Sequence, residues 1–227
     1  MIKNNIVKNV NAVGINVQDS FESAWIIVEN NDISTSIYGS HVHGWIDAGY
    51  GIAAHSIFAF RDMPGYKIDI IGNNIECTKP GYSGINICGS FNTHDVAKFL
   101  EGTVSGNRIH LDNGLTGIKV GRSDNITVSE NTLSGRAYYG IRVHGKSTPN
   151  DIVIYSEDNV VTNNDMQMLR INECDQFSRK LGDGISFFLG GNTAHIWLDE
   201  YSKNNLIHIN SEDTIIDQGF LNEVKIV

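Results

Sequence analysis

Residues 124–144 read DNITVSENTLSGRAYYGIRVH and hold one unit of a pattern that recurs along the chain. The unit starts with an alternating segment at 126–128, bends at Asn131, places Leu133 two positions later, and ends in a segment of the form GIxV at 140–143. Segments in which apolar and polar residues alternate form strands that bury one face. The unit therefore predicts short strands joined at an asparagine.

Both parts of the unit recur in the same phase. The asparagine precedes an apolar residue by two positions at Asn4, Asn31, Asn73, Asn107, Asn131 and Asn159, with a degenerate copy at Asn192. The GIxV form recurs at 14–17, 51–54, 84–87, 117–120 and 140–143, with weaker copies at 169–171, 207–209 and 224–226. A core unit of roughly two dozen residues that carries insertions is typical of a solenoid. We expect an all-β parallel β-solenoid of about seven to eight coils, forming a single domain over residues 1–227.

The repeated asparagine has a structural explanation. In stacked coils, strands lie about 4.8 Å apart, so asparagines in register at one bend can hydrogen-bond along the stack as a ladder. Asparagine also tolerates the left-handed backbone that a tight bend needs. We therefore expect this residue to hold the coils together and not to contact a ligand.

The run IxVxxNxI followed by GIxV resembles the single-stranded right-handed parallel β-helix of the pectate-lyase-like superfamily, over nearly the whole chain from Asn4 to Ile226. This superfamily includes polysaccharide lyases, polygalacturonase-type hydrolases, epimerases and phage tailspike depolymerases. The resemblance implies this fold, activity on a polysaccharide, and an active site on the outer face of the GIxV strands. The polygalacturonase-like motif set is absent. WIDA at 45–48 and WLDE at 197–200 lack the histidine of calcium-dependent pectate lyases.

Composition excludes several partners. There are 17 Lys and Arg residues against 26 Asp and Glu residues, a net charge of -9, whereas nucleic-acid binding requires a basic surface. No apolar run approaches the length of a membrane span, and the N-terminal residues lack the apolar region of a signal peptide. We expect neither a nucleic-acid nor a membrane partner. The cellular location is not encoded, although action outside the cell or on a virion fits the resemblance.

Both ends of the chain lack the cap that normally covers a solenoid end. The first residues already belong to a coil, and residues 225–227 finish on a strand. We interpret the chain as a piece of a longer solenoid, or as a protomer whose ends are covered by homo-oligomerisation or end-to-end stacking. Three cysteines cannot form a fully paired disulfide framework, and Cys77 is expected to face inward.

The residue x of GIxV is expected to face solvent, because the Ile and Val beside it point inward. Read coil by coil, this outer row is Asn16, Ala53, Asn86, Lys119, Arg142, Arg170, His208 and Lys225, and it is basic over its last five positions. A second polar row two residues later is Gln18, His55, Cys88, His144, Asn172 and Asn210. One interpretation is a groove for an acidic polysaccharide of the uronate or sialate type. The other is a solvated face whose cations are neutralised by nearby acids.

The two rows suggest chemistry as well as binding. A lyase needs a base that removes the proton next to a sugar carboxylate, and a cation that holds that carboxylate. A hydrolase needs two carboxyl groups instead. The catalytic candidates are Arg142, His144 and Arg170 for a lyase, and Glu173 and Asp183 for a hydrolase. The substrate-binding candidates are Lys119, His208, His55, Trp45 and Tyr139.

The insertion at 34–50, STSIYGSHVHGWIDAGY, carries Trp45 among several histidines and aromatic residues. It is either a wall of a carbohydrate cleft, because sugar rings stack on aromatic faces, or an extra edge strand. His41 and His43 have no further ligands at metal-site spacing, so no metal site and no cofactor is predicted, and calcium has only weak support.

A short helix is expected at 94–100. Three functions remain open, namely a polysaccharide-cleaving enzyme, a non-catalytic binding or adhesion module, and a structural spacer.

Overall fold

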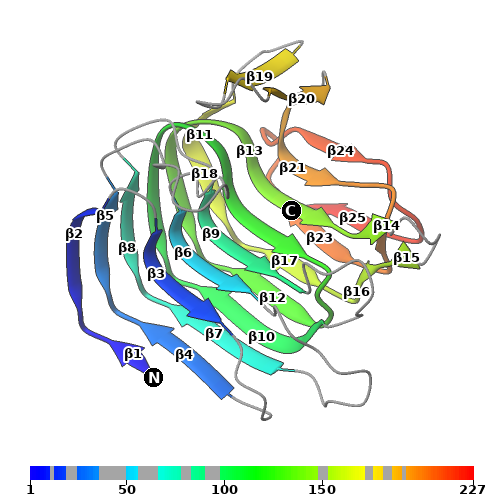
Figure 1. Cartoon of the computed structure of the whole chain (residues 1–227). Helices are drawn as coiled ribbons and strands as arrows, with labels where there is room; N and C mark the ends of the chain where they lie inside the picture. The colour runs from blue at the N-terminus through cyan, green and yellow to red at the C-terminus, as the bar shows by residue number, and fades with distance from the viewer. Residues whose placement is uncertain are drawn as a thin grey trace.

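The computed structural model describes residues 1–10, 13–18, 25–35, 50–55, 66–77, 83–89, 98–147, 153–171, 176–180, 186–190 and 193–227. Strands, bends and turns make up these ranges, and no helix occurs within them. The chain winds through successive coils, and Figure 1 shows the colour changing from blue to red along the stack as each coil adds to the previous one. The predicted all-β parallel solenoid is confirmed.

The first face is an eight-stranded sheet in which neighbouring strands come from successive coils and run parallel. Its strands are β1 (Ile2–Lys3), β4 (Trp25–Glu29), β7 (Tyr66–Ile71), β10 (Phe99–Ser105), β12 (Ile126–Ser129), β17 (Val160–Thr162), β23 (Leu206–Ile209) and β25 (Glu223–Ile226).

The second and third faces share one eleven-stranded sheet, because β11 (Arg108–Gly121) and β13 (Thr132–His144) each run through both. The other strands of the second face are β2 (Ile6–Val10), β5 (Asp32–Thr35), β8 (Asn74–Cys77) and β18 (Asp165–Ile171). The other strands of the third face are β3 (Val13–Gln18), β6 (Tyr50–His55), β9 (Ser83–Cys88), β21 (Ala194–Leu198) and β24 (Ile215–Asp217).

Three small pairs lie outside these faces. β14 (Lys146–Ser147) and β15 (Val153–Ile154) are antiparallel, β16 (Ser156–Glu157) and β22 (Ser202–Lys203) are parallel, and β19 (Gln176–Lys180) and β20 (Ser186–Gly190) are antiparallel. The pair β19–β20 comes in the chain between β18 of the second face and β21 of the third, so it interrupts a coil. This interruption decides which residues reach the third face.

The core consists of files of apolar side chains, one per coil, as the alternation predicts. On the first face the file is Val28, Ile70, Val104, Val128, Val161 and Ile207, and on the third it is Ile15, Ile52, Ile85, Ile118, Ile141 and Ile196. Almost all are fully buried. Cys77 lies in this core, as predicted. Stacked isoleucine and valine thus supply the hydrophobic stabilisation of each added coil.

An asparagine ladder runs along the corner between the first and second faces. Its members are Asn5, Asn31, Asn73, Asn107, Asn131 and Asn164. Each of the first five donates its backbone N–H and its side-chain amide to the Oδ1 of the next, at 2.9–3.1 Å. The predicted ladder is therefore confirmed, with two changes of membership. Asn5 replaces Asn4 at the start, and Asn164 follows Asn131 where Asn159 was expected.

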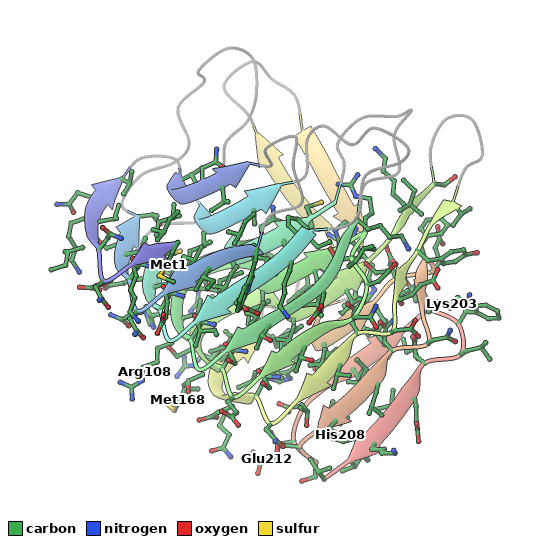
Figure 2. All side chains as sticks on the ribbon, turned by 90° about the horizontal axis from the view of Figure 1, so that it is seen from below. Met1, Arg108, Met168, Lys203, His208 and Glu212 are labelled. Carbon is green, nitrogen blue, oxygen red and sulfur yellow. The ribbon has the colours of Figure 1, made fainter. Side chains whose placement is uncertain are left out.

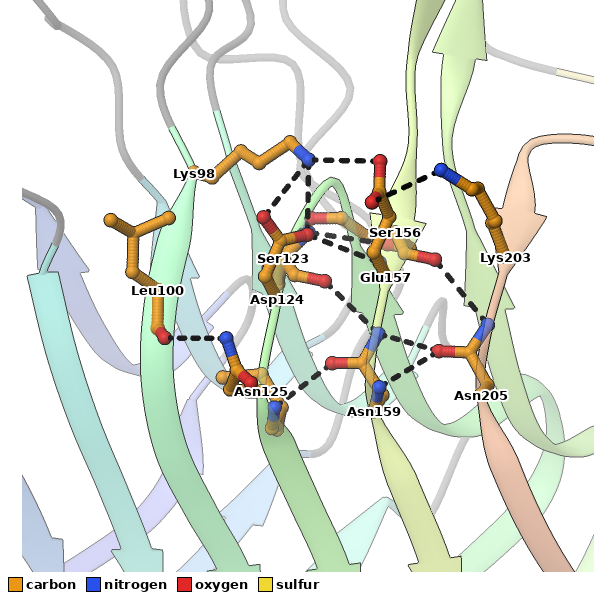
Figure 3. A network of polar contacts seen from close by, with 12 residues as sticks. Lys98, Leu100, Ser123, Asp124, Asn125, Ser156, Glu157, Asn159, Lys203 and Asn205 are labelled. Atoms are coloured by element: carbon orange, nitrogen blue, oxygen red, sulfur yellow. Dashed lines mark hydrogen bonds and ion pairs between the residues drawn. The ribbon is translucent and has the colours of Figure 1, made fainter. Parts of the chain in front are cut away.

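Asn159 belongs to a second ladder, at the corner between the third and first faces. It donates its side-chain amide to Asn205 Oδ1 at 2.9 Å (Figure 3). Asn205 donates in the same way to Asn222. Beside this ladder, Lys98 lies 3.0 Å from Asp124 and 3.8 Å from Glu157. Lys203 reaches the same glutamate from the next coil at 3.6 Å. These partly buried ion pairs join the coils at this corner.

The left-handed residue at each corner is the one before the ladder asparagine. At the first corner these residues are Asn4, Asn30, Gly72, Gly106, Glu130 and Asn163, and at the second they are Asp158, Asn204 and Leu221. The sequence interpretation gave the left-handed backbone to the ladder asparagine itself, and this was wrong by one position. The degenerate copy at Asn192 lies outside the described residues. So does most of the helix expected at 94–100, of which Phe99 and Leu100 belong to strand β10.

Candidate functional site

The predicted outer row is confirmed for its first five members and wrong for the rest. Asn16, Ala53, Asn86, Lys119 and Arg142 are paired in register across the third face. The next two members are Trp197 and Ile216, not basic residues. The row therefore joins two cations to an aromatic side chain.

The last three basic residues lie on other faces. Arg170 pairs with Arg136 on the second face, because β18 contacts only the first half of β13. His208 and Lys225 pair with each other on the first face, where Thr162 Oγ1 lies 3.0 Å from His208 Nδ1. Figure 2 separates these surfaces: Arg108 and Met168 project from the second face, away from His208. The continuous file of five basic residues does not exist.

The outer row is also more buried than expected. Asn86 is 1% exposed and Lys119 is 9% exposed, whereas Arg142 and Trp197 are partly exposed. Alternation correctly predicts that these side chains leave the core. It does not predict that they remain shielded from water on the outside. The row thus runs from a buried part at Asn86 to an accessible part at Trp197.

Arg142 is fixed by two aromatic rings at the accessible part. Its guanidinium carbon lies 4.1 Å from the centroid of Trp197 and 5.9 Å from that of Tyr139. The two rings stack on each other, with centroids 4.9 Å apart and an interplanar angle of 19°. A cation over aromatic rings is attracted by their π-electrons. Stacking engages the flat face of the guanidinium, and the N–H groups in its plane are those that bind carboxylates.

A third cation, Arg122, lies just after β11. It is 5% exposed and has a φ of 50°, which a bulky side chain rarely adopts. Its backbone N–H donates to the carbonyl of His144 at 2.8 Å, and its Nη2 donates to Cys88 Sγ. Arg122 thereby links the coils on either side of its own. These contacts hold the residue in its left-handed conformation.

The imidazole of His144 has one unprotonated nitrogen, Nε2. Its Nδ1 lies 3.0 Å from the Gly145 carbonyl oxygen, which can only accept, so Nδ1 carries the proton. Its Nε2 is buried and has no hydrogen-bond partner among the described residues. The ring extends over Gly121, where a Cβ would lie 2.3 Å from Nε2. Because Gly121 lies between Cys88 and His144 in register, the missing side chain leaves room for the imidazole.

The electrostatic surroundings keep His144 neutral. Burial lowers the pKa of His144 well below its ordinary value, and the charges of Lys119, Arg142 and Arg122 lower it further. A neutral imidazole with Nδ1–H has a lone pair on Nε2 and can accept a proton there. Asp199 supports this arrangement, because its Oδ1 accepts from the N–H of Gly145 at 3.1 Å. Burial raises the pKa of Asp199, although its hydrogen bonds and Arg142 oppose the shift.

The remaining predicted residues are placed as follows. Tyr139 is buried and belongs to the site. The backbone of His55 pairs with Cys88 in the second row, but its side chain is outside what the structure describes. Trp45, Glu173 and Asp183 lie outside the described residues, as do Asn172 and Asp175.

The described residues contain no group of three or more His, Cys, Asp or Glu side chains that could hold a metal ion. They also contain no helix that could span a membrane.

Comparison of the chain with protein-family models, with curated proteins and with solved structures finds no match. What the site does must therefore be argued from its chemistry.

Three residues of the site were missed or misread from sequence. Arg122 directly follows Gly121, which pairs in register with Cys88 and His144 of the second row, and a cation next to this row was a usable signal. Trp197 and Asp199 were considered only as part of a calcium motif. Their place beside Arg142 and His144 depends on β21 following β13 in the stack, which the spacing of the repeats does not show.

Proposed function

We propose that the third face binds an acidic polysaccharide and removes a proton next to a uronate carboxylate, as a polysaccharide lyase does. The observation that carries this proposal is the convergence of Lys119 and Arg142 with the neutral base His144 beside the stacked rings of Tyr139 and Trp197. The cations suit the sugar carboxylate, and the aromatic edge suits a pyranose ring.

Each part has a distinct chemical task. The proton next to a carboxylate becomes easier to remove when cations stabilise the charge that develops on that carboxylate. Arg142 holds the carboxylate, and Lys119 adds positive charge from the preceding coil. His144 Nε2 accepts the proton, and the same cations keep it neutral before the reaction. Asp199 acts through Gly145, whose carbonyl accepts from Nδ1–H and so leaves the lone pair of His144 on Nε2.

A hydrolase has less support in the described residues. It needs two carboxyl groups that flank the glycosidic bond. Asp199 is one carboxyl group at this site, and its Oδ1 is engaged by the N–H groups of Gly145 and Tyr201, at 3.1 and 3.0 Å. Cations with a neutral base match β-elimination better than they match acid-assisted hydrolysis.

The experiment is a panel of uronate-containing polysaccharides and neutral glucans, followed by calorimetric binding, by the absorbance of unsaturated products and by reducing ends. Arg142→Met keeps most of the aliphatic part of the side chain and removes the charged guanidinium group. Loss of a charge-assisted hydrogen bond costs about 1.5–3 kcal/mol, so affinity should fall about 10- to 100-fold. Arg170→Met is the matched control, because Arg170 is exposed on the second face. Affinity for the acidic glycan should be unchanged in this variant.

His144→Gln separates catalysis from binding. It should abolish unsaturated product while the affinity for acidic glycan stays within a few-fold of wild type. Binding by the wild-type protein without any product would instead favour a non-catalytic carbohydrate-binding module. Equal effects of Arg142→Met and Arg170→Met, or no binding to any acidic glycan, would refute the proposal.

A further inference from the structure

Cys88 lies in the second row of the third face and contacts a buried cation. It is 1% exposed, and its Sγ accepts a hydrogen bond from Nη2 of Arg122. The guanidinium cannot move freely, because Arg122 is itself buried and its backbone N–H is bonded to His144 across the adjacent coil. The fold thus places a fixed positive charge against a thiol that the proposed lyase reaction does not use.

The charges favour the anionic form of this thiol. Burial alone raises the pKa of Cys88, but the charges of Arg122, Lys119 and Arg142, with the hydrogen bond from Arg122, outweigh burial and leave the pKa below its ordinary value. Cys77 provides the contrast within the same chain. It is equally buried, and desolvation raises its pKa. Only the thiolate is a strong nucleophile, so the two cysteines should differ in reactivity.

Two acceptor atoms on this face have no partner. Asn86 is 1% exposed, lies two residues before Cys88 on the outer face of β9, and its Oδ1 makes no hydrogen bond among the described residues. The second is Nε2 of His144, which lies over Gly121, next to Cys88 in register. Unsatisfied buried acceptors are rare and call for an explanation. Acceptors beside cations suit a small molecule with both O–H donors and oxygen acceptors.

We propose that Cys88 is an oxidation site for hydrogen peroxide or a similarly small hydroperoxide. The thiol proton passes to solvent, and the thiolate sulfur attacks one peroxide oxygen. An S–O bond forms as the O–O bond breaks, giving Cys88 sulfenic acid and hydroxide. The sulfur loses two electrons and the peroxide gains them, and the hydroxide takes a proton from solvent to leave as water. The cations stabilise the departing hydroxide, while Asn86 and His144 accept from the peroxide O–H groups.

The test uses the full chain with Cys174→Ser, so that Cys77 and Cys88 are the remaining cysteines. Peroxide is added at neutral pH, and addition of one oxygen atom is followed by intact mass and assigned by peptide mapping. Cys88 should react at least about tenfold faster than Cys77, because the pKa of Cys88 is lowered whereas that of Cys77 is raised. A thiol reductant should reverse the change. No glycan is involved, so the result is independent of the proposed lyase activity.

Arg122→Asn tests the cause. Asparagine tolerates the left-handed backbone at this position and removes the charge, so the oxidation of Cys88 should slow on the order of tenfold. Cys88→Ser should abolish the added oxygen, whereas Cys77→Ser should retain it. Oxidation of Cys77 as fast as Cys88 in the otherwise unaltered protein would overturn the proposal. An unchanged rate in folded Arg122→Asn would overturn it as well.

Discussion

Substitution of Asn131 by alanine should destabilise the solenoid far more than substitution of an exposed asparagine. The side chain of Asn131 is fully buried. Its Oδ1 accepts from the backbone N–H of Asn107 at 3.0 Å and from the Asn107 side chain at 2.9 Å. Its Nδ2 donates to the carbonyl of Val104 and to Oδ1 of Asn164, both at 2.9 Å. Alanine removes all of these interactions and leaves the partners buried.

The expected loss follows from these contacts. Each neutral hydrogen bond contributes about 1 kcal/mol net, so four contribute about 4 kcal/mol. The two Asn107 donors that lose their acceptor add about 1–3 kcal/mol each if they stay dry. Water that enters the vacated space can hydrogen-bond to these groups and so reduces the loss of stability. We expect the free energy of unfolding to fall by about 3–5 kcal/mol, a large share of the roughly 5–15 kcal/mol typical of a domain.

Urea denaturation followed by circular dichroism and tryptophan fluorescence measures this change. Asn74→Ala is the matched control, since Asn74 is exposed, directly follows the ladder member Asn73, and donates one hydrogen bond to Asp32 at 3.0 Å. Its effect should be about 0.5 kcal/mol or less. The urea slope must stay constant between variants for the comparison to hold. A loss below about 1 kcal/mol for Asn131→Ala, or one equal to that of the control, would refute the stabilising role of the ladder.

The other predictions concern a pair of glycines and one histidine. Gly135→Ala should destabilise by more than about 3 kcal/mol, because its Cβ would lie 2.1 Å from the Leu111 carbonyl oxygen at a φ of 92°. Gly106→Ala has a φ of 63° and its nearest neighbour at 3.9 Å, so it should lose only about 1–2 kcal/mol, and equal losses in urea unfolding would contradict the steric argument. The folded state holds the pKa of His144 well below 6.5, so its contribution to stability is complete above about pH 6.5 and falls as the pH drops toward the folded pKa. His144→Gln should flatten that decline in urea midpoints measured across pH, and an unchanged slope would count against a neutral imidazole.

The asparagine pattern predicted the ladder but could not assign every member to a corner. Asn131 precedes Leu133, and Asn159 precedes Val161, with the same spacing. Both corners of the coil use an asparagine preceded by a left-handed residue, so the local sequences are alike. Only the pairing of β17 with β12 shows that Asn159 belongs to the second corner. Sequence spacing defines the motif, and the stacking partner defines its place.

The predicted register of the third face was wrong for a related reason. Leu169, Arg170 and Ile171 have the polarity of a weakened GIxV strand, yet they belong to the second face. The pair β19–β20 follows them before the chain reaches β21, so in this coil the extra residues lie in the chain between the second and third faces, as residues 36–49 do between β5 and β6. A period measured along the chain cannot show on which face an insertion occurs. The burial of Lys119 could not be read from alternation either, since alternation separates inside from outside only within one sheet.

The three cations of the third face, Lys119, Arg122 and Arg142, lower the pKa of two neighbouring groups. One of these groups becomes positively charged when it is protonated, and the other becomes negatively charged when it loses its proton. Positive charge disfavours a second positive charge, so it lowers the pKa of His144 and keeps the imidazole neutral. It favours a negative charge, so it lowers the pKa of Cys88 and promotes the thiolate. Both shifts favour the deprotonated form, which is the neutral imidazole of His144 and the thiolate of Cys88. The cations that we propose bind an acidic sugar therefore also act on the base and on the thiol beside them. Arg122 also connects the two residues through hydrogen bonds, because its backbone N–H donates to the His144 carbonyl while its side chain donates to Cys88 Sγ.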